Sequence, residues 1–68
     1  MDIRELKQLR RQLKVSQEEA ARGLGIARLG LSVLESGYIQ PTAETLHAYA
    51  SYLNKRLEEI QQIPKVGA

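Results

Sequence analysis

The most constraining feature of this chain is the segment formed by residues 15–37, VSQEEAARGLGIARLGLSVLESG. It contains two helix-favouring runs, and a glycine follows each of them, at Gly25 and Gly37. Ser16 and Glu19 form a capping-box pattern, in which the hydroxyl accepts a free backbone N–H and the carboxylate reaches back to the cap. Gly25 can adopt the left-handed conformation that ends a helix at little cost. The segment therefore predicts two short helices joined by a tight turn.

A further helix is expected on each side of this segment. Asp2 and Glu5 repeat the capping-box pattern at the start of a helix that should end at about Leu13. Its apolar residues recur every three or four positions and form one stripe, made of Ile3, Leu6, Leu9 and Leu13. Thr42 is a suitable N-cap for a later helix. The buried face of that helix should hold Leu46, Tyr49, Ala50 and Leu53.

The C-terminal part of the chain allows two interpretations. Leu57, Ile60 and Ile63 are spaced by three, which favours a short fifth helix that Pro64 would end. In the alternative, residues 55–60 are extended and pair with a second subunit.

Composition restricts both the fold and the chemistry. A chain of 68 residues holds one domain, which we expect over residues 1–63, with a frayed tail at residues 64–68. Two prolines and few strand-like runs favour an all-α fold. The chain has no cysteine for a disulfide or a thiolate metal site, and no apolar run long enough to span a bilayer. No catalytic cluster is visible, so we expect no enzyme, metal site or cofactor, and we interpret His47 as a partly buried structural residue.

The net charge of +2 is unevenly distributed. Residues 1–28 hold seven basic and four acidic side chains, which gives +3, whereas residues 29–68 carry −1. A positive first half is compatible with a polyanionic partner. The alternative is that these basic residues are only the solvated face of the first helix.

A longer pattern extends over about residues 3–60. It consists of Leu9, Leu13, Val15-Ser16-Gln17-Glu18-Glu19, Ala21, Leu24-Gly25-Ile26, Leu34-Glu35, Gly37, Pro41-Thr42, Glu44-Thr45-Leu46, Ala50, Leu53 and Leu57-Glu58-Glu59-Ile60. This pattern resembles the lambda-repressor-like, or Cro/repressor-type (XRE), helix-turn-helix domains. The resemblance implies an all-α, compact five-helix bundle with the helix-turn-helix at about residues 16–36. It also implies that the third helix lies in the major groove of DNA.

The resemblance suggests roles for individual residues. Base edges are expected to be read from the third helix, by Ala27, Arg28, Leu29, Ser32 and Val33. Contacts with DNA phosphates are expected from Lys7, Arg11, Gln17, Ser36, Tyr38 and Gln40. Arg10 and Glu35 match positions that form a buried ion pair between the first and third helices in some members of the family.

The expected third helix departs from the family on the face that reads sequence. Family members usually carry polar residues there, whereas here only Arg28 and Ser32 can form hydrogen bonds with base edges. In one interpretation Arg28 binds a guanine, the apolar neighbours contact thymine methyl groups, and Gly30 lets the helix backbone lie close to DNA. In the other, the face around Leu29 and Val33 serves a protein partner or an enlarged core.

These observations predict a sequence-specific transcriptional regulator that binds double-stranded DNA, as a homodimeric (auto)repressor on an inverted-repeat operator. The dimer contact is expected from Tyr52, Leu53, Leu57, Ile60 and Ile63. The resemblance implies a regulator from bacteria, phages or mobile elements that works in the cytoplasm without a membrane partner. The alternative is an antitoxin-like module that uses the same fold to bind a protein such as a toxin, with weak or no sequence-specific DNA binding.

Overall fold

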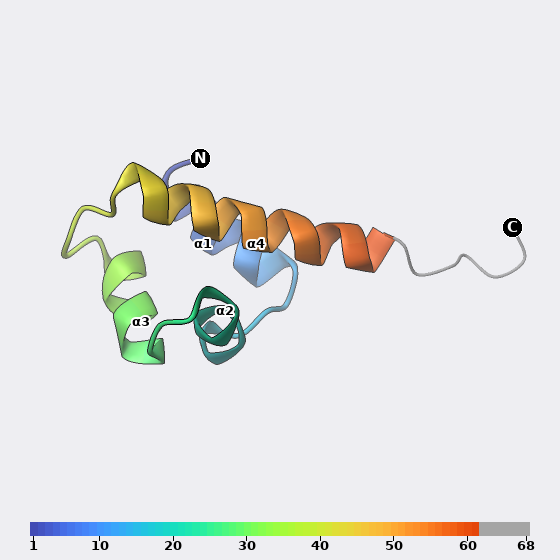
Figure 1. Ribbon diagram of the computed structural model, residues 1–68, viewed down its shortest axis with the longest axis horizontal. Coiled ribbons are helices and arrows are strands. Elements are labelled where there is room, and N and C mark those ends of the chain that lie inside the picture. The colour runs from blue at the N-terminus through green and yellow to red at the C-terminus, as the bar shows by residue number, and fades with distance from the viewer. Residues whose placement is uncertain (62–68) are drawn as a thin grey trace, which may run out of the picture.

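Four helices form the part of the chain that the computed structural model describes, residues 1–61 (Figure 1). In chain order they are α1 (Ile3–Gln12), α2 (Gln17–Leu24), α3 (Arg28–Ser36) and α4 (Ala43–Gln61). Within these residues the fold is all-α, as predicted, and the central segment forms the two short helices α2 and α3. The expected domain boundary after residue 63 and the expected tail at residues 64–68 lie outside the described residues.

The N-termini of α1, α2 and α4 are capped by the side chains that the sequence indicated, whereas Ala27 gives α3 no side-chain cap. Asp2 accepts the N–H of Glu5 at 2.9 Å, and the Glu5 carboxylate accepts the N–H of Asp2 at 3.1 Å, so the capping box of α1 is complete. Ser16 accepts the N–H of Glu19 at 3.0 Å at the start of α2. Thr42 caps α4 in the same way, at 3.1 Å.

Each of the first three helices is followed by a residue with a left-handed backbone. Gly25 (φ +72°) and Gly37 (φ +84°) follow α2 and α3, as predicted. The third such residue is Lys14 (φ +59°), which the sequence did not indicate because lysine is not a turn-favouring residue. Its N–H donates to the carbonyl of Arg11 at 3.0 Å, and the following N–H donates to the carbonyl of Arg10 at 3.1 Å. This pair of hydrogen bonds is a Schellman motif.

The predicted fifth helix is wrong, because α4 continues without a break over Ala43–Gln61. This stretch contains neither glycine nor proline. Leu53, Leu57 and Ile60 are four and three positions apart, so they continue the stripe of one helix. The alternative of an extended segment at residues 55–60 is also wrong, since these residues are helical. Neither α4 nor any other described helix is long and apolar enough to cross a membrane.

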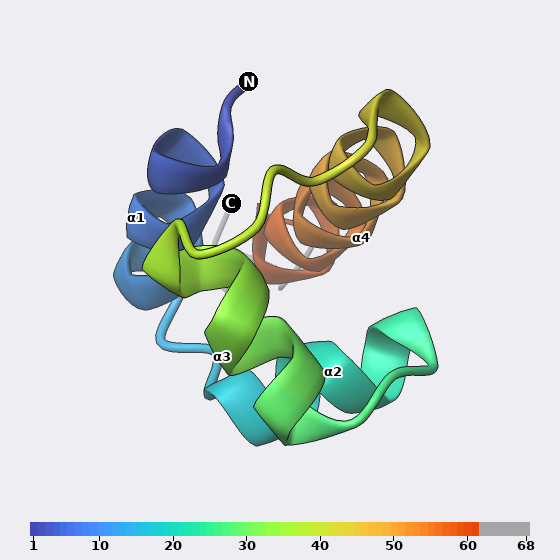
Figure 2. The ribbon, with the colours of Figure 1, turned by 90° about the vertical axis from the view of Figure 1, so that its left-hand side faces the viewer.

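The core lies where the four helices meet. α2 packs against α3, α1 packs against α4, and further contacts join α2 to α4 and α1 to α3. α3 lies at one end of the bundle, at the left of Figure 1 and nearest the viewer in Figure 2. The buried apolar residues come from all four helices and from the loop after α1: Leu6, Val15, Ala20, Ala21, Leu31, Tyr49 and Leu53.

Two side chains of α4 hold α2 in place. The ring of Tyr52 lies so close to Gly23 that a Cβ atom added there would overlap the ring, at 2.7 Å from Cδ1. Arg56 donates to the Glu19 carboxylate at 2.8 Å. This ion pair engages the carboxylate that was expected to return to the N–H of Ser16. Among the described residues, only the hydroxyl half of the predicted capping box of α2 is therefore present.

Candidate nucleic-acid interface

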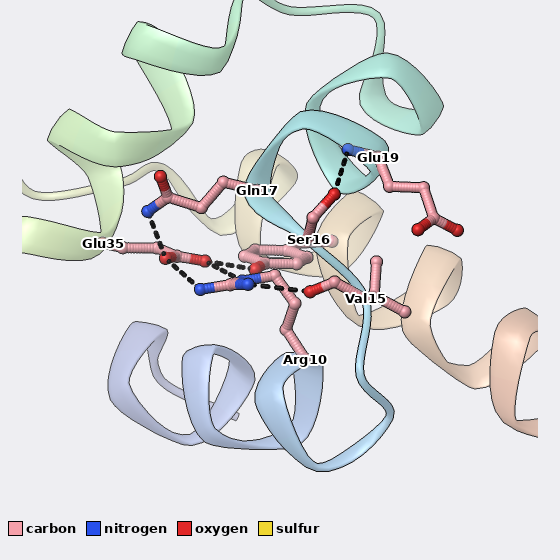
Figure 3. A network of polar contacts seen from close by, with 7 residues as sticks. Arg10, Val15, Ser16, Gln17, Glu19 and Glu35 are labelled. Carbon is pink, nitrogen blue, oxygen red and sulfur yellow. Dashed lines mark hydrogen bonds and ion pairs between the residues drawn. The ribbon is translucent and has the colours of Figure 1, made fainter.

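A buried ion pair joins α1 to α3 (Figure 3). Nε of Arg10, in the last turn of α1, donates to Oε2 of Glu35 at 2.8 Å, and Nη2 donates to Oε1 at 3.0 Å. The remaining nitrogen, Nη1, donates to the backbone carbonyl of Val15 at 2.8 Å. A planar guanidinium matches a carboxylate in this two-pronged geometry. The two residues that the sequence resemblance paired thus meet in the structure.

Two further side chains complete the hydrogen bonds of Glu35. The hydroxyl of Tyr49, from α4, donates to Oε2, and Nε2 of Gln17, from the start of α2, donates to Oε1 at 3.0 Å. With the two bonds from Arg10, the carboxylate accepts four hydrogen bonds, two at each oxygen. Burying a charge is costly unless the charge is paired and hydrogen-bonded, and Glu35 meets both conditions.

The network determines the ionisation of its members. Burial alone would raise the pKa of Glu35, but hydrogen bonds from Arg10, Tyr49 and Gln17 outweigh burial and hold this pKa below its ordinary value of 4.5. Burial and the hydrogen bond to Glu35 both raise the pKa of Tyr49. Burial lowers the pKa of Arg10, but the hydrogen bond and the charge of Glu35 together raise it by more. The net shift of the pKa is therefore upward. At neutral pH, Glu35 is therefore an anion and Tyr49 a neutral donor.

α3 is held by this network on one side and presents its other side to solvent. Its buried residues are Leu31 and Glu35. The five residues predicted to read bases differ in exposure: Ala27, Arg28 and Leu29 are exposed, and Ser32 and Val33 are half-buried. Since 71% of the surface of Leu29 is exposed, this residue does not belong to an enlarged core.

The last residue of α3, Ser36, and the loop after it carry three of the predicted phosphate contacts. The hydroxyl of Ser36 donates to the carbonyl of Val33 at 2.6 Å and accepts the N–H of Tyr38 at 3.2 Å. Ser36 therefore stabilises the end of α3. Tyr38 is 89% exposed, and Gln40 is also exposed. These two side chains are the accessible candidates in the loop.

α2 and α3 together form a helix, a glycine turn and a second helix with one exposed side. A comparison with protein families matches residues 6–60 to the family described as Helix-turn-helix. The chain belongs to this helix-turn-helix family. The match spans most of α1 and nearly all of α4, and it confirms the resemblance to XRE-type, lambda-repressor-like domains, a family of DNA-binding regulators. No curated protein and no solved structure matches the chain.

The helix-turn-helix domain carries the other three candidate phosphate contacts on α1 and α2. Arg11 is exposed on α1, whereas Lys7 is half-buried there. Gln17 is half-buried at the first position of α2, and its side-chain amide donates an N–H to Glu35. This contact was not predicted from the sequence. Because an amide nitrogen has two N–H groups, the one that Glu35 does not engage remains for a second acceptor.

The candidate dimer contacts fall into different environments within the domain. Leu53 is fully buried in the core of its own chain, so it cannot contact a second copy, and this corrects its assignment. Tyr52 is half-buried against α2. Leu57 is half-buried and Ile60 is 42% exposed on the last turns of α4, which extend beyond the other helices in Figure 1. Ile63 lies outside the described residues.

The sequence also did not reveal the role of the Tyr49 hydroxyl or the exposure of His47. Tyr49 was predicted as core, which is confirmed, but its hydroxyl bond to Glu35 was not foreseen. A signal existed, since a buried tyrosine hydroxyl usually needs a partner and Glu35 was the expected buried anion. His47 was expected to be partly buried, but it is exposed on α4.

Proposed function

We propose that this chain is a sequence-specific transcriptional regulator that binds double-stranded DNA as a homodimeric repressor on an inverted repeat. The observation that carries the proposal is the exposed side of α3 in a helix-turn-helix domain, where Arg28 and Leu29 reach solvent. In domains of this kind the second helix of the motif enters the major groove. Arg28 is then placed to donate to O6 and N7 of a guanine.

The network around Glu35 supports this role because it fixes the orientation of α3. A helix that reads bases must lie in a defined position relative to the groups that contact the DNA backbone. Glu35 ties α3 to Arg10 of α1, to Tyr49 of α4 and to Gln17 of α2 by hydrogen bonds. The contact with Gln17 aligns the start of α2 with α3. We therefore assign Gln17 to a phosphate of the same half-site that α3 reads, contacted through its second amide N–H.

Other phosphate contacts are assigned to accessible side chains around α3. Arg11 on α1 is exposed, and so are Tyr38 and Gln40 in the loop after α3. Lys7 is half-buried, but a lysine can extend its ammonium group beyond a buried stem. Contacts of this type supply affinity that does not depend on base sequence.

A dimer follows from the small footprint of one recognition helix. A single helix-turn-helix contacts few base pairs, so affinity for one operator requires two copies with half-sites about one helical turn apart. The half-buried ring of Tyr52 packs against Gly23 of α2, whereas Ile60 and Leu57 retain exposed surface on the last turns of α4. We place the contact between copies there. The repressor role rests on the resemblance to repressor-type domains.

Single-base-pair variants of a bound duplex test this proposal. Arg28→Ala should relax specificity at one base pair of each half-site, with a loss of about 1–3 kcal/mol of discrimination. Arg11→Ala, which removes an exposed charge assigned to a phosphate, should weaken binding to every sequence by a similar factor. Fluorescence anisotropy measures both effects. Equal losses on all sequences for both variants would exclude base reading by Arg28.

A second candidate function is binding of a protein partner through α3. The observation that favours it is the 71% exposure of Leu29, because an exposed large apolar residue beside Val33 is typical of an interface. Salt distinguishes the two functions. DNA binding through several phosphates weakens steeply between about 50 and 200 mM salt, whereas an apolar protein interface does not.

A further inference from the structure

The exposed side of α3 has little capacity for hydrogen bonds with bases. Arg28 is exposed and Ser32 is half-buried. The third polar side chain, Ser36, uses its hydroxyl within the chain, as donor to Val33 and as acceptor from Tyr38. Arg28 is thus the one strong donor that α3 offers to the groove among the described residues.

The same side of α3 presents an apolar row. Residues four apart lie on the same side of a helix, one turn from each other. Leu29 and Val33 therefore form an apolar row, and Arg28 and Ser32 form a polar row beside it. Leu29 is 71% exposed, and Ala27 before it is also exposed. The apolar row therefore offers accessible surface directly beside the polar row.

The major groove contains one apolar group that suits such a row. Each thymine presents a C5-methyl group there, whereas the other base edges present mainly donors and acceptors. Gly30 lies next to the apolar row, on the side away from Arg28 and Ser32, and a Cβ atom added there would meet no heavy atom within 4 Å. No side chain covers the helix backbone at Gly30, and this allows Leu29 to approach a methyl group closely.

We propose that α3 reads the C5-methyl group of a pyrimidine beside the guanine bound by Arg28, so that binding responds to cytosine methylation. Thymine and 5-methylcytosine carry the same methyl group at this edge, and uracil and cytosine lack it. Both methylated bases are accepted at the position that faces Leu29. Both unmethylated bases are bound more weakly. This inference rests on the proposed function and specifies what α3 recognises.

The test uses the duplex enriched from a random DNA pool by the purified chain. Each thymine of the half-site is replaced in turn by deoxyuridine, which removes the methyl group and keeps base pairing. We expect the affinity to fall about three- to tenfold at one or two positions, as the loss of one buried methyl contact implies. A duplex with a cytosine–guanine pair at the same position should bind the chain weakly. Methylation of that cytosine at C5 should increase the affinity at least threefold.

Two variants assign the effect to the apolar row. Leu29→Ala should abolish the difference between thymine and deoxyuridine, and because Leu29 is exposed the variant should fold normally. Ile39→Ala removes an exposed aliphatic side chain outside α3 and should leave that difference unchanged. Circular dichroism checks that both variants are folded.

The outcomes separate this inference from the proposed function. Specific binding with equal affinity for thymine and deoxyuridine at every position would overturn methyl reading and leave the proposed function intact. Retention of the thymine preference in Leu29→Ala would also overturn the inference. A chain that enriches no sequence from the pool would overturn both.

Discussion

Arg10 and Glu35 lie 25 positions apart in the sequence, yet two hydrogen bonds of 2.8 and 3.0 Å join them in the interior of the domain. The carboxylate side chain retains 1% of its accessible surface, and the guanidinium side chain retains 9%. The pair fixes α3, which carries the candidate reading residues, to α1. In the proposed function, stability and DNA recognition are therefore linked through the same two side chains.

Removal of Arg10 should strongly destabilise the domain. Arg10→Ala leaves the buried anion of Glu35 without its charge partner, and the free energy of unfolding should fall by about 3–5 kcal/mol. Arg11→Ala, which truncates the exposed neighbour, should change it by no more than about 0.5 kcal/mol. Urea denaturation measures both values. An Arg10→Ala variant with the midpoint of the unchanged chain would contradict the structural role of the pair.

The free energy of unfolding should decrease in acid because of Glu35. The folded chain holds the pKa of Glu35 below its ordinary value of 4.5, so the unfolded chain takes up the proton first. The contribution of Glu35 is fully present above pH 4.5 and is lost as the pH falls through the folded pKa. Denaturation midpoints measured from neutral pH downward should show this decline.

The free energy of unfolding should also decrease at alkaline pH, because of Tyr49. Its pKa is raised in the folded chain, so its contribution is present below its ordinary pKa of 10.0 and is lost as the pH rises through the higher folded value. Tyr49→Phe should remove this alkaline decline. It should also make the acid decline shallower, because the hydroxyl bond to Glu35 helps to lower the pKa of that carboxyl. A pH profile unchanged by Tyr49→Phe would argue against the bond.

Two glycines within helices should respond in opposite ways to alanine. Gly30→Ala should stabilise the domain by up to about 1 kcal/mol, since its Cβ atom meets no neighbour within 4 Å and alanine favours helix. Gly23→Ala should instead destabilise it by about 1–3 kcal/mol, because the Cβ atom overlaps the ring of Tyr52. Thermal unfolding measures both. Stabilisation by both substitutions would mean that Tyr52 moves aside without cost.

Two residues with a left-handed backbone, Lys14 and Gly25, should also respond in opposite ways to substitution. Lys14→Gly should stabilise the domain by about 1 kcal/mol, because a side chain at φ +59° is strained and glycine is not. Gly25→Ala should destabilise it by a similar amount at φ +72°. A Lys14→Gly variant less stable than the unchanged chain would indicate that lysine contributes contacts that outweigh the strain.

The first three helices could be predicted from sequence because their ends carry local signals. Asp2 and Ser16 cap the helices that they precede, and Gly25 and Gly37 follow the helices that they end. The end of α1 at Lys14 carries no such signal, because the turn there is stabilised by backbone hydrogen bonds. The sequence also did not indicate the full extent of α4. The spacing by three of Leu57, Ile60 and Ile63 was interpreted as a new helix, although no glycine or proline separates these residues from the start of α4.

The candidate site could be predicted only in part. The pairing of Arg10 with Glu35 came from the family resemblance, and the exposure of Arg28 and Leu29 agrees with their expected positions. The contacts of Glu35 with Gln17 and Tyr49 are tertiary and depend on how three helices pack, which spacing along one helix does not reveal. Leu53 was assigned to a dimer contact because its position in the stripe does not distinguish core from interface.

Selection of bound duplexes from a random DNA pool is the most direct test of base reading by α3. We expect enrichment of an inverted repeat whose half-sites lie about one helical turn apart. Each half-site should contain a guanine that Arg28→Ala no longer selects. A pool that remains random at low salt would contradict base reading by α3. The exposed row around Leu29 would then be assigned to a protein partner.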